Sequence, residues 1–272
     1  MIVMQPVLET DTPDGFDLWP VAATERFGFL PLSGALSPAE IGAALMRIAA
    51  CNDGAPETEG DLPPRPAGRL EGFLHGLLYR DGLHAAGGLR VTDDSTGATF
   101  APGPCDGLED WHDWYRLADS SGRIGHGPDP QPSRAERLGD TIRLTVDTDR
   151  NDGPVIELPV TELRRLLAGA ERDLTGFLAA ASRWISEHLP AHATPLTAAL
   201  TRLLGLPLPL PAPAPKSHNA ASPVSARSRT RASCTSGATG TPTTTNRRPT
   251  SWKSTPTHAG CARWSSPMTE AR

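Results

Sequence analysis

Lysine is the residue that this chain most conspicuously lacks. The 272 residues contain two lysines, Lys216 and Lys253, and residues 1–215 contain none. Asparagine and isoleucine are also scarce, whereas Ala, Gly, Pro, Leu and Arg abound. Because lysine and asparagine use AT-rich codons, this bias indicates a GC-rich genome. It concerns the origin of the chain and leaves its activity open.

Long apolar runs and paired cysteines are missing as well. No segment approaches the roughly 20 consecutive apolar residues that a membrane helix needs, and residues 1–17 lack the basic and apolar regions of a signal peptide. The cysteines have neither metal-ligand spacing nor a paired pattern. We therefore expect a cytoplasmic protein with no membrane partner. The four cysteines are Cys51, Cys105, Cys234 and Cys261.

Charge divides the chain into two parts. Residues 1–215 hold 17 Lys and Arg against 30 Asp and Glu, a net charge of −13, whereas residues 216–272 hold nine basic residues against Glu270, a net charge of +8. An acidic body disfavours nucleic acid as its partner. We predict a single acidic α+β domain at 1–206, a Pro-rich linker at 207–215 and a basic tail beyond it.

The tail is rich in Ser and Thr and has no apolar periodicity, so it is predicted to be disordered. In one interpretation it is a basic arm that binds nucleic acid in a salt-dependent way. Arg247-Arg248 is its only tight basic pair, however, and no Lys/Arg block of five to eight residues is present.

A second interpretation makes residues 216–272 a frame-shifted translation. In the frame that joins the third base of each codon to the first two bases of the next, Trp252-Lys253 becomes Glu and Met268-Thr269 becomes Asp. The alternative frame can encode an acidic, aromatic segment like the body. The nucleotide sequence decides between the two interpretations.

Two hairpins and a capped helix are predicted in the body. Residues 87–91 and 98–100 flank a turn-rich centre, and residues 142–146 alternate apolar and polar before a polar turn and a return strand at 155–158. The sequence Ser37-Pro38-Ala39-Glu40 is typical of a helix start with a capping box.

The strongest pattern is one amphipathic helix over residues 163–188, which Pro190 ends. Gly169 and Gly176 weaken it and are expected to allow close packing. A shorter helix follows at about 195–204.

Residues 53–69 and 119–139 are predicted to be loops, and residues 26–30 are a strand candidate. Together these elements predict an α+β fold. Its hairpins contribute to one mostly antiparallel sheet, and the long helix packs across that sheet.

The segment Trp111-His112-Asp113-Trp114 is the candidate binding site. A helix here would turn Trp111 and Tyr115 inward and leave Trp114, His112 and Asp113 facing outward. An exposed indole beside an imidazole suits a recognition surface. The alternative, the packed end of an amphipathic helix with no binding role, stays open.

No metal or cofactor site is predicted. Residues 147–153 resemble the start of a calcium loop, but the spacing of the glycine is wrong and strands flank the segment, so a polar hairpin turn is the better interpretation. His188 and His192 have zinc-ligand spacing for a continuous helix, yet Pro190 lies between them. Cys105 precedes the predicted helix start at Asp106, and a helix N-terminus lowers the pKa of a nearby thiol.

The segments GGLRV, WHDW and GPVIELPVTELRRLLAGAERDLTGFL resemble uncharacterised proteins of Streptomyces-type actinobacteria. The resemblance covers roughly residues 25–205. It agrees with the GC-rich codon bias and implies no activity, cofactor or catalytic residue.

The leading functional hypothesis is a non-enzymatic protein-binding module, of immunity type or regulatory, whose partner is another protein. Its basis is the small acidic domain and the lack of any catalytic motif. One alternative is a small enzyme that uses Cys105, His112 or Asp113. Another is nucleic-acid binding through the basic tail.

Overall fold

The computed structural model describes seven ranges of the chain, and their elements belong to one compact unit. The predicted linker from residue 208 and the tail, with both interpretations of it, lie outside these ranges, as do Cys105 and the calcium-like turn at 147–152. No helix within the described part of the chain is long and apolar enough to cross a membrane. The ranges are 1–13, 15–53, 62–103, 106–120, 123–124, 133–146 and 153–207.

The first sheet is antiparallel, with the strand order β2-β1-β3-β4. It contains the predicted first hairpin, which is confirmed as β3 and β4, and the strand candidate near residue 28. Its strands are β1 (Ile2–Thr10), β2 (Gly28–Pro31), β3 (Gly87–Asp93) and β4 (Ala98–Phe100).

Strand β1 is the centre of this sheet, and the sequence did not predict it. Its burial does not alternate, because consecutive residues from Pro6 to Leu8 are buried. Pro6 has no N–H for the ladder, and its carbonyl oxygen accepts the Leu32 N–H at 2.8 Å. Both features hide the period-two pattern by which strands are recognised.

The second sheet is also antiparallel, with the order β5-β6-β7-β8. Strands β7 and β8 are the predicted second hairpin, and Arg143 faces Glu157 across it with 2.8 Å between the charged groups. The predicted loop at 119–139 is wrong in part, because β5 and β6 lie within it. The strands are β5 (Arg123–Ile124), β6 (Arg134–Leu138), β7 (Thr141–Thr145) and β8 (Val155–Pro159).

The two hairpins therefore belong to two sheets and not to the single sheet that was expected. The helices complete the α+β fold. The predicted capping box is present, since Ser37 N–H donates to Glu40 Oε2 (2.7 Å) and Glu40 N–H donates to Ser37 Oγ (3.4 Å). The helices are α1 (Pro38–Asn52), α2 (Arg69–Tyr79), which was not predicted, η2 (Leu108–His112), α3 (Asp113–Asp119), α4 (Val160–His188), η3 (Pro190–His192) and α5 (Ala193–Leu204).

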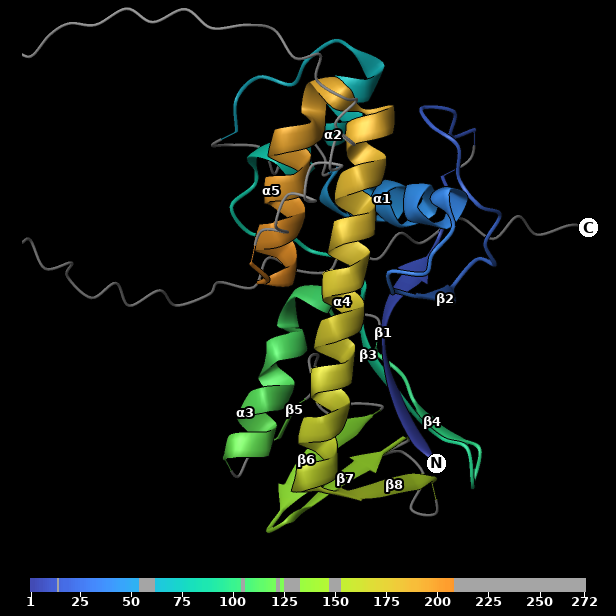
Figure 1. The fold of residues 1–272 in the computed structure, drawn as a ribbon, viewed down its shortest axis with the longest axis vertical. Coiled ribbons are helices and arrows are strands. Elements are labelled where there is room, and N and C mark those ends of the chain that lie inside the picture. Colours follow the sequence, from blue (N-terminus) through green and yellow to red (C-terminus); the bar gives the residue numbers. More distant parts are fainter. Residues whose placement is uncertain are drawn as a thin grey trace, which may run out of the picture. The chain divides into compact units, whose positions relative to one another are not determined.

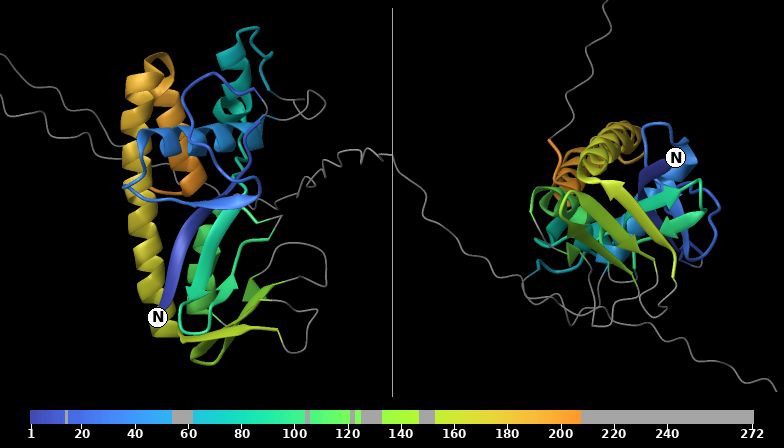
Figure 2. Two further views of the ribbon diagram at one scale, coloured as in Figure 1. Left: turned by 90° about the vertical axis from the view of Figure 1, so that its right-hand side faces the viewer. Right: turned by 90° about the horizontal axis from the view of Figure 1, so that it is seen from below.

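Helix α4 is the predicted long amphipathic helix. It runs from the second sheet past β1 of the first, and also contacts α1, α3 and α5 (Figures 1 and 2). Twelve of its side chains are buried and recur at spacings of three and four residues, from Val160 to Ile185. One apolar stripe on α4 therefore joins the two sheets and the other helices.

Gly176 lets a loop approach α4 closely. A Cβ atom at Gly176 would lie 3.0 Å from the backbone nitrogen of Gly34 and 3.1 Å from its Cα atom. A Cβ atom at Gly169, seven residues earlier in the same helix, would meet only the guanidinium of Arg172, at 3.8 Å. The expected close packing therefore holds for Gly176.

These two glycines should respond oppositely to one substitution. Gly169→Ala is expected to raise the free energy of unfolding by about 0.5–1 kcal/mol, because alanine favours helix. Gly176→Ala is expected to lower it by about 1–2 kcal/mol, because the new methyl group pushes against backbone atoms that cannot rotate away. Urea denaturation of both variants measures the difference, and a stabilising Gly176→Ala would contradict the close contact.

Candidate functional site

The WHDW segment spans the junction of η2 and α3. The 3₁₀ helix η2 has three residues per turn and places Leu108 and Trp111 on one side, and Trp114 follows three residues later in α3. Trp111 is 1 % exposed and Trp114 is 6 % exposed. The prediction that Trp114 faces outward is therefore wrong, because residues three positions apart share a face in an α-helix as well as in a 3₁₀ helix.

The four predicted binding residues make internal contacts. Trp111 Nε1–H donates to the Leu204 carbonyl oxygen (2.9 Å) at the end of α5. The ring of His112 lies against Trp111, with 3.9 Å between centroids, and burial lowers the pKa of His112. Asp113 pairs with Arg116 at 2.8 Å. The segment thus ties η2 to α5, while its role in binding stays a prediction.

The two histidines with zinc-ligand spacing have different partners. His188 Nδ1 lies 2.9 Å from the Trp184 carbonyl oxygen, and its ring stacks on Trp184. His192 Nε2 lies 3.8 Å from a carboxylate oxygen of Glu71 on α2. Within the described ranges, no three His, Cys, Asp or Glu side chains are placed to hold a metal ion together.

A histidine that the sequence analysis did not single out is held more firmly than any of these. His84 lies in the connection between α2 and β3. Its backbone N–H donates to Asn52 Oδ1 (3.0 Å), and its carbonyl oxygen accepts from Asn52 Nδ2 (2.8 Å). Asn52, at the end of α1, is 3 % exposed and also donates to the Ile48 carbonyl oxygen. A buried amide therefore fixes the backbone of His84.

The side chain of His84 is fixed by Glu109, in the first turn of η2. Its Nδ1 atom lies 2.6 Å from Glu109 Oε1, and the other carboxylate oxygen accepts the Ala85 N–H at 3.0 Å. The carboxylate folds back over Gly107, where a Cβ atom would lie within 2.1–2.5 Å of the carboxylate atoms. The missing side chain at Gly107 makes room for Glu109 in this position.

Charges from two elements, η2 and α1, surround this pair. The hydrogen bond with Glu109 raises the pKa of His84 above its ordinary value, and burial opposes the rise. Asp110 favours the charged imidazolium, and Arg47 on α1 disfavours it. Burial raises the pKa of the nearby Cys51 thiol.

A carboxylate bonded to one imidazole nitrogen holds the ring in one orientation and stabilises its protonated form. The arrangement can therefore hold a proton at a higher pH than an ordinary histidine does. The sequence offered no signal for it, because Asn52, His84 and Glu109 are distant in the chain and form no recognised motif.

A third feature is the turn that connects the loop after β1 to β2. Gly28 N–H donates to the Glu25 carbonyl oxygen (3.3 Å), and Phe27, the third residue of this turn, has φ = 60°. Among the described residues other than glycine, Phe27 alone has positive φ. Its side chain is 70 % exposed.

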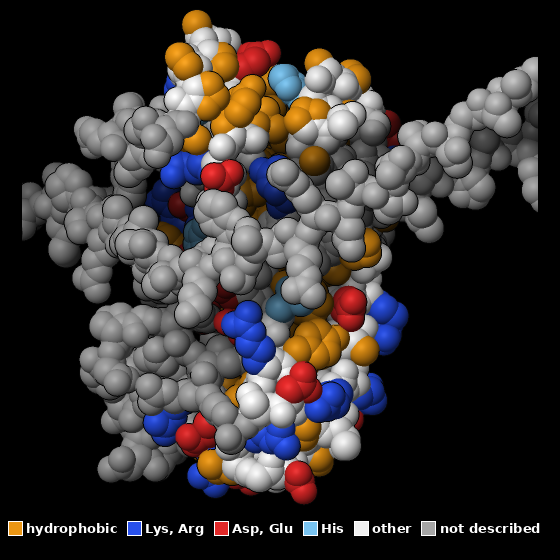
Figure 3. Space-filling view, turned by 90° about the vertical axis from the view of Figure 1, so that its left-hand side faces the viewer, with side chains coloured by type: hydrophobic (Ala, Val, Ile, Leu, Met, Phe, Trp, Pro, Cys, Tyr) orange, Lys and Arg blue, Asp and Glu red, His pale blue; other side chains and the backbone are white. Residues whose placement is uncertain are grey.

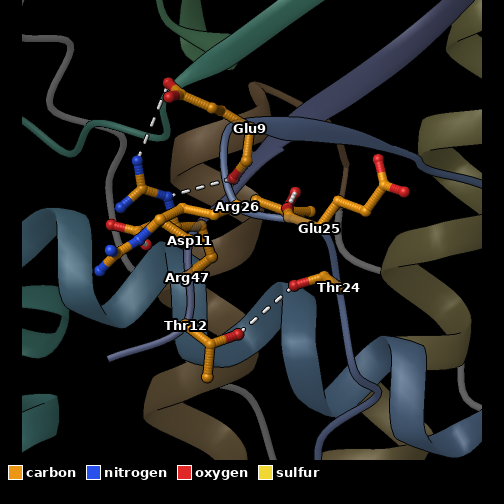
Figure 4. Close-up of polar contacts among 8 residues, drawn as sticks. Glu9, Asp11, Thr12, Thr24, Glu25, Arg26 and Arg47 are labelled. Atoms are coloured by element: carbon orange, nitrogen blue, oxygen red, sulfur yellow. Dashed lines mark hydrogen bonds and ion pairs between the residues drawn. The ribbon is translucent and has the colours of Figure 1, made fainter. Parts of the chain in front are cut away.

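Side chains on both sides of the loop hold the turn in place (Figure 4). Thr10 Oγ1–H donates to the Glu25 carbonyl oxygen (2.6 Å), and the Thr10 carbonyl oxygen accepts the Phe27 N–H at 2.8 Å. Arg26 pairs with Asp11 at 3.2 Å. Arg47 Nε–H donates to the carbonyl oxygen of Glu9, the residue before Thr10, at 3.1 Å.

Comparison of the chain with protein-family models, with curated proteins and with solved structures finds no match.

The hydrogen bond of Trp111 can be tested against Trp114. Trp111→Phe should lower the free energy of unfolding by about 1–3 kcal/mol more than Trp114→Phe, because it leaves the carbonyl oxygen of Leu204 without its donor. Both variants remove the same part of a buried indole. Urea denaturation gives the two values, and equal losses would show that the bond to Leu204 contributes nothing.

Proposed function

We propose that this chain is a non-enzymatic protein-binding module that presents Phe27 to another protein. The observation that carries the proposal is the combination of 70 % exposure and a left-handed backbone at Phe27. An immunity-type or regulatory role fits such a module.

The backbone at Phe27 works against the stability of the fold. An L-residue in the left-handed region costs roughly 1–2 kcal/mol, and the third position of a turn with positive φ favours Gly or Asn. A mostly exposed ring recovers little of this cost through burial. Backbone strain of this kind concentrates at functional sites, and aromatic side chains supply much of the binding energy of protein interfaces.

The turn is arranged in advance for binding. The bonds from Thr10 to Glu25 and Phe27 lie on the part that joins β1 to β2, so the ring is presented from a sheet edge. Ordering a loop on association costs free energy. A turn that is already held by hydrogen bonds avoids much of that cost.

Charge indicates the kind of partner. Residues 11–27 carry four acidic residues and one basic residue, so Phe27 follows an acidic loop. The acidic excess is not uniform over the molecule, since the face in Figure 3 carries side chains of both signs next to one another. We infer that the partner offers an apolar pocket with basic residues at its rim.

Substitution of Phe27 by glycine should separate stability from binding. Phe27→Gly is expected to raise the free energy of unfolding by roughly 1 kcal/mol, because glycine adopts positive φ without strain. The same change should weaken binding of the partner at least tenfold, because it removes the central aromatic contact. Urea denaturation measures the first effect.

Binding is measured by recovery of a stoichiometric partner from lysate of the source cells, followed by calorimetric titration of that purified partner. Tyr79→Ala is the matched control, because Tyr79 is another aromatic residue that is more than half exposed. It should leave the affinity unchanged. Failure to recover a stoichiometric partner, or equal affinity of Phe27→Gly and the unaltered chain, would overturn the proposal.

A further inference from the structure

Three elements of the fold, η2, β1 and α1, are hydrogen-bonded to the connection between α2 and β3. Ala85 accepts the Leu108 N–H of η2 (2.8 Å), and Ala86 accepts the Glu9 N–H of β1 (2.8 Å). Asn52 of α1 holds the backbone of His84 on both sides. A change in this connection therefore alters the hydrogen bonds of β1, α1 and η2 together.

One contact in this connection depends on a proton. We propose that His84 and Glu109 form a pH-responsive clamp, which fastens the connection between α2 and β3 to η2 when His84 is protonated and loosens it when His84 is neutral. The geometry carries this inference. One carboxylate accepts from the imidazole through Oε1 and from the backbone of the next residue, Ala85, through Oε2.

The charges around the clamp come from η2 and α1. Glu109 and Asp110 on η2 attract the imidazolium, and Arg47 on α1 repels it. The guanidinium of Arg47 is itself engaged by Glu9, with 3.8 Å between the charged atoms. The net effect raises the pKa of His84, so the imidazolium form is the one that the folded structure favours.

The direction of the pH dependence follows from that shift. The pKa of His84 is higher in the folded chain than in the unfolded chain, so the clamp contributes its full stability below about pH 6.5, the ordinary value for histidine. Its contribution falls as the pH rises through the raised value. The clamp is closed below the titration midpoint of His84 and loose above it.

Gly107 provides a way to open the clamp without touching either member of the pair. A methyl group there would occupy the space of the Glu109 carboxylate. The backbone of Gly107, with φ of −120°, is one that alanine adopts readily. Gly82 is the matched control, because it lies in the same connection and nothing lies within 4 Å of a Cβ atom placed on it.

The experiment uses the full chain and follows the imidazole of His84 by NMR across the neutral pH range. In the unaltered chain the midpoint should lie above about 6.5. It should fall in Gly107→Ala and in Glu109→Gln, and stay in place in Gly82→Ala. If Gly107→Ala does not fold, Glu109→Gln gives the same answer, since it removes the charge and keeps the shape of the side chain.

A second readout tests the clamp itself. Hydrogen exchange of the Ala85 N–H, corrected for its intrinsic rate, should become several-fold faster as the pH rises through the His84 midpoint. If the pKa of His84 is shifted by one unit, the exchange rate can increase about tenfold at most. This dependence should vanish in Glu109→Gln. The proposal would be overturned if the His84 midpoint were that of an ordinary histidine or if neither variant moved it. It would also be overturned if the exchange rate of the Ala85 N–H did not change as His84 titrates.

Discussion

Burial of the apolar stripe on α4 is the interaction on which the rest of the structure depends. Helix α4 begins directly after β8, contacts β7 and β8, and then passes along β1 of the first sheet. Its far end packs against α1 and α5. A helix of 29 residues is about 44 Å long at 1.5 Å per residue. It therefore reaches from one sheet to the helices beyond the other.

Elements with a strong local pattern could be predicted from the sequence. The capping box at Ser37 and Glu40, the alternation in β7 and the three-and-four spacing of α4 each lie within a short stretch of chain. Strand β1 could not be recognised, because its burial falls on consecutive residues and because proline is rare inside a central strand. The division into two sheets depends on pairing between distant strands, which periodicity does not encode.

The candidate sites were harder to predict than the fold. The aromatic content of the WHDW segment was visible in the sequence, but the burial of Trp114 depends on how the junction of η2 and α3 packs against the rest of the fold. The positive φ of Phe27 follows from the register of β1 and β2 and from the Thr10 contacts, all of which are tertiary. The carboxylate that contacts the His84 ring belongs to Glu109, 25 positions later in the chain.

The position of β1 has a consequence for synthesis of the chain on the ribosome. The central strand of the first sheet is made 76 residues before β3, its longest pairing partner, and α4 follows later still. At about 5–20 residues per second, β1 waits roughly 4–15 s for β3. During that time its apolar side chains, and the backbone groups that later pair with β3, are open to chaperones and to other nascent chains. The order of the elements thus makes the first sheet a late product of translation.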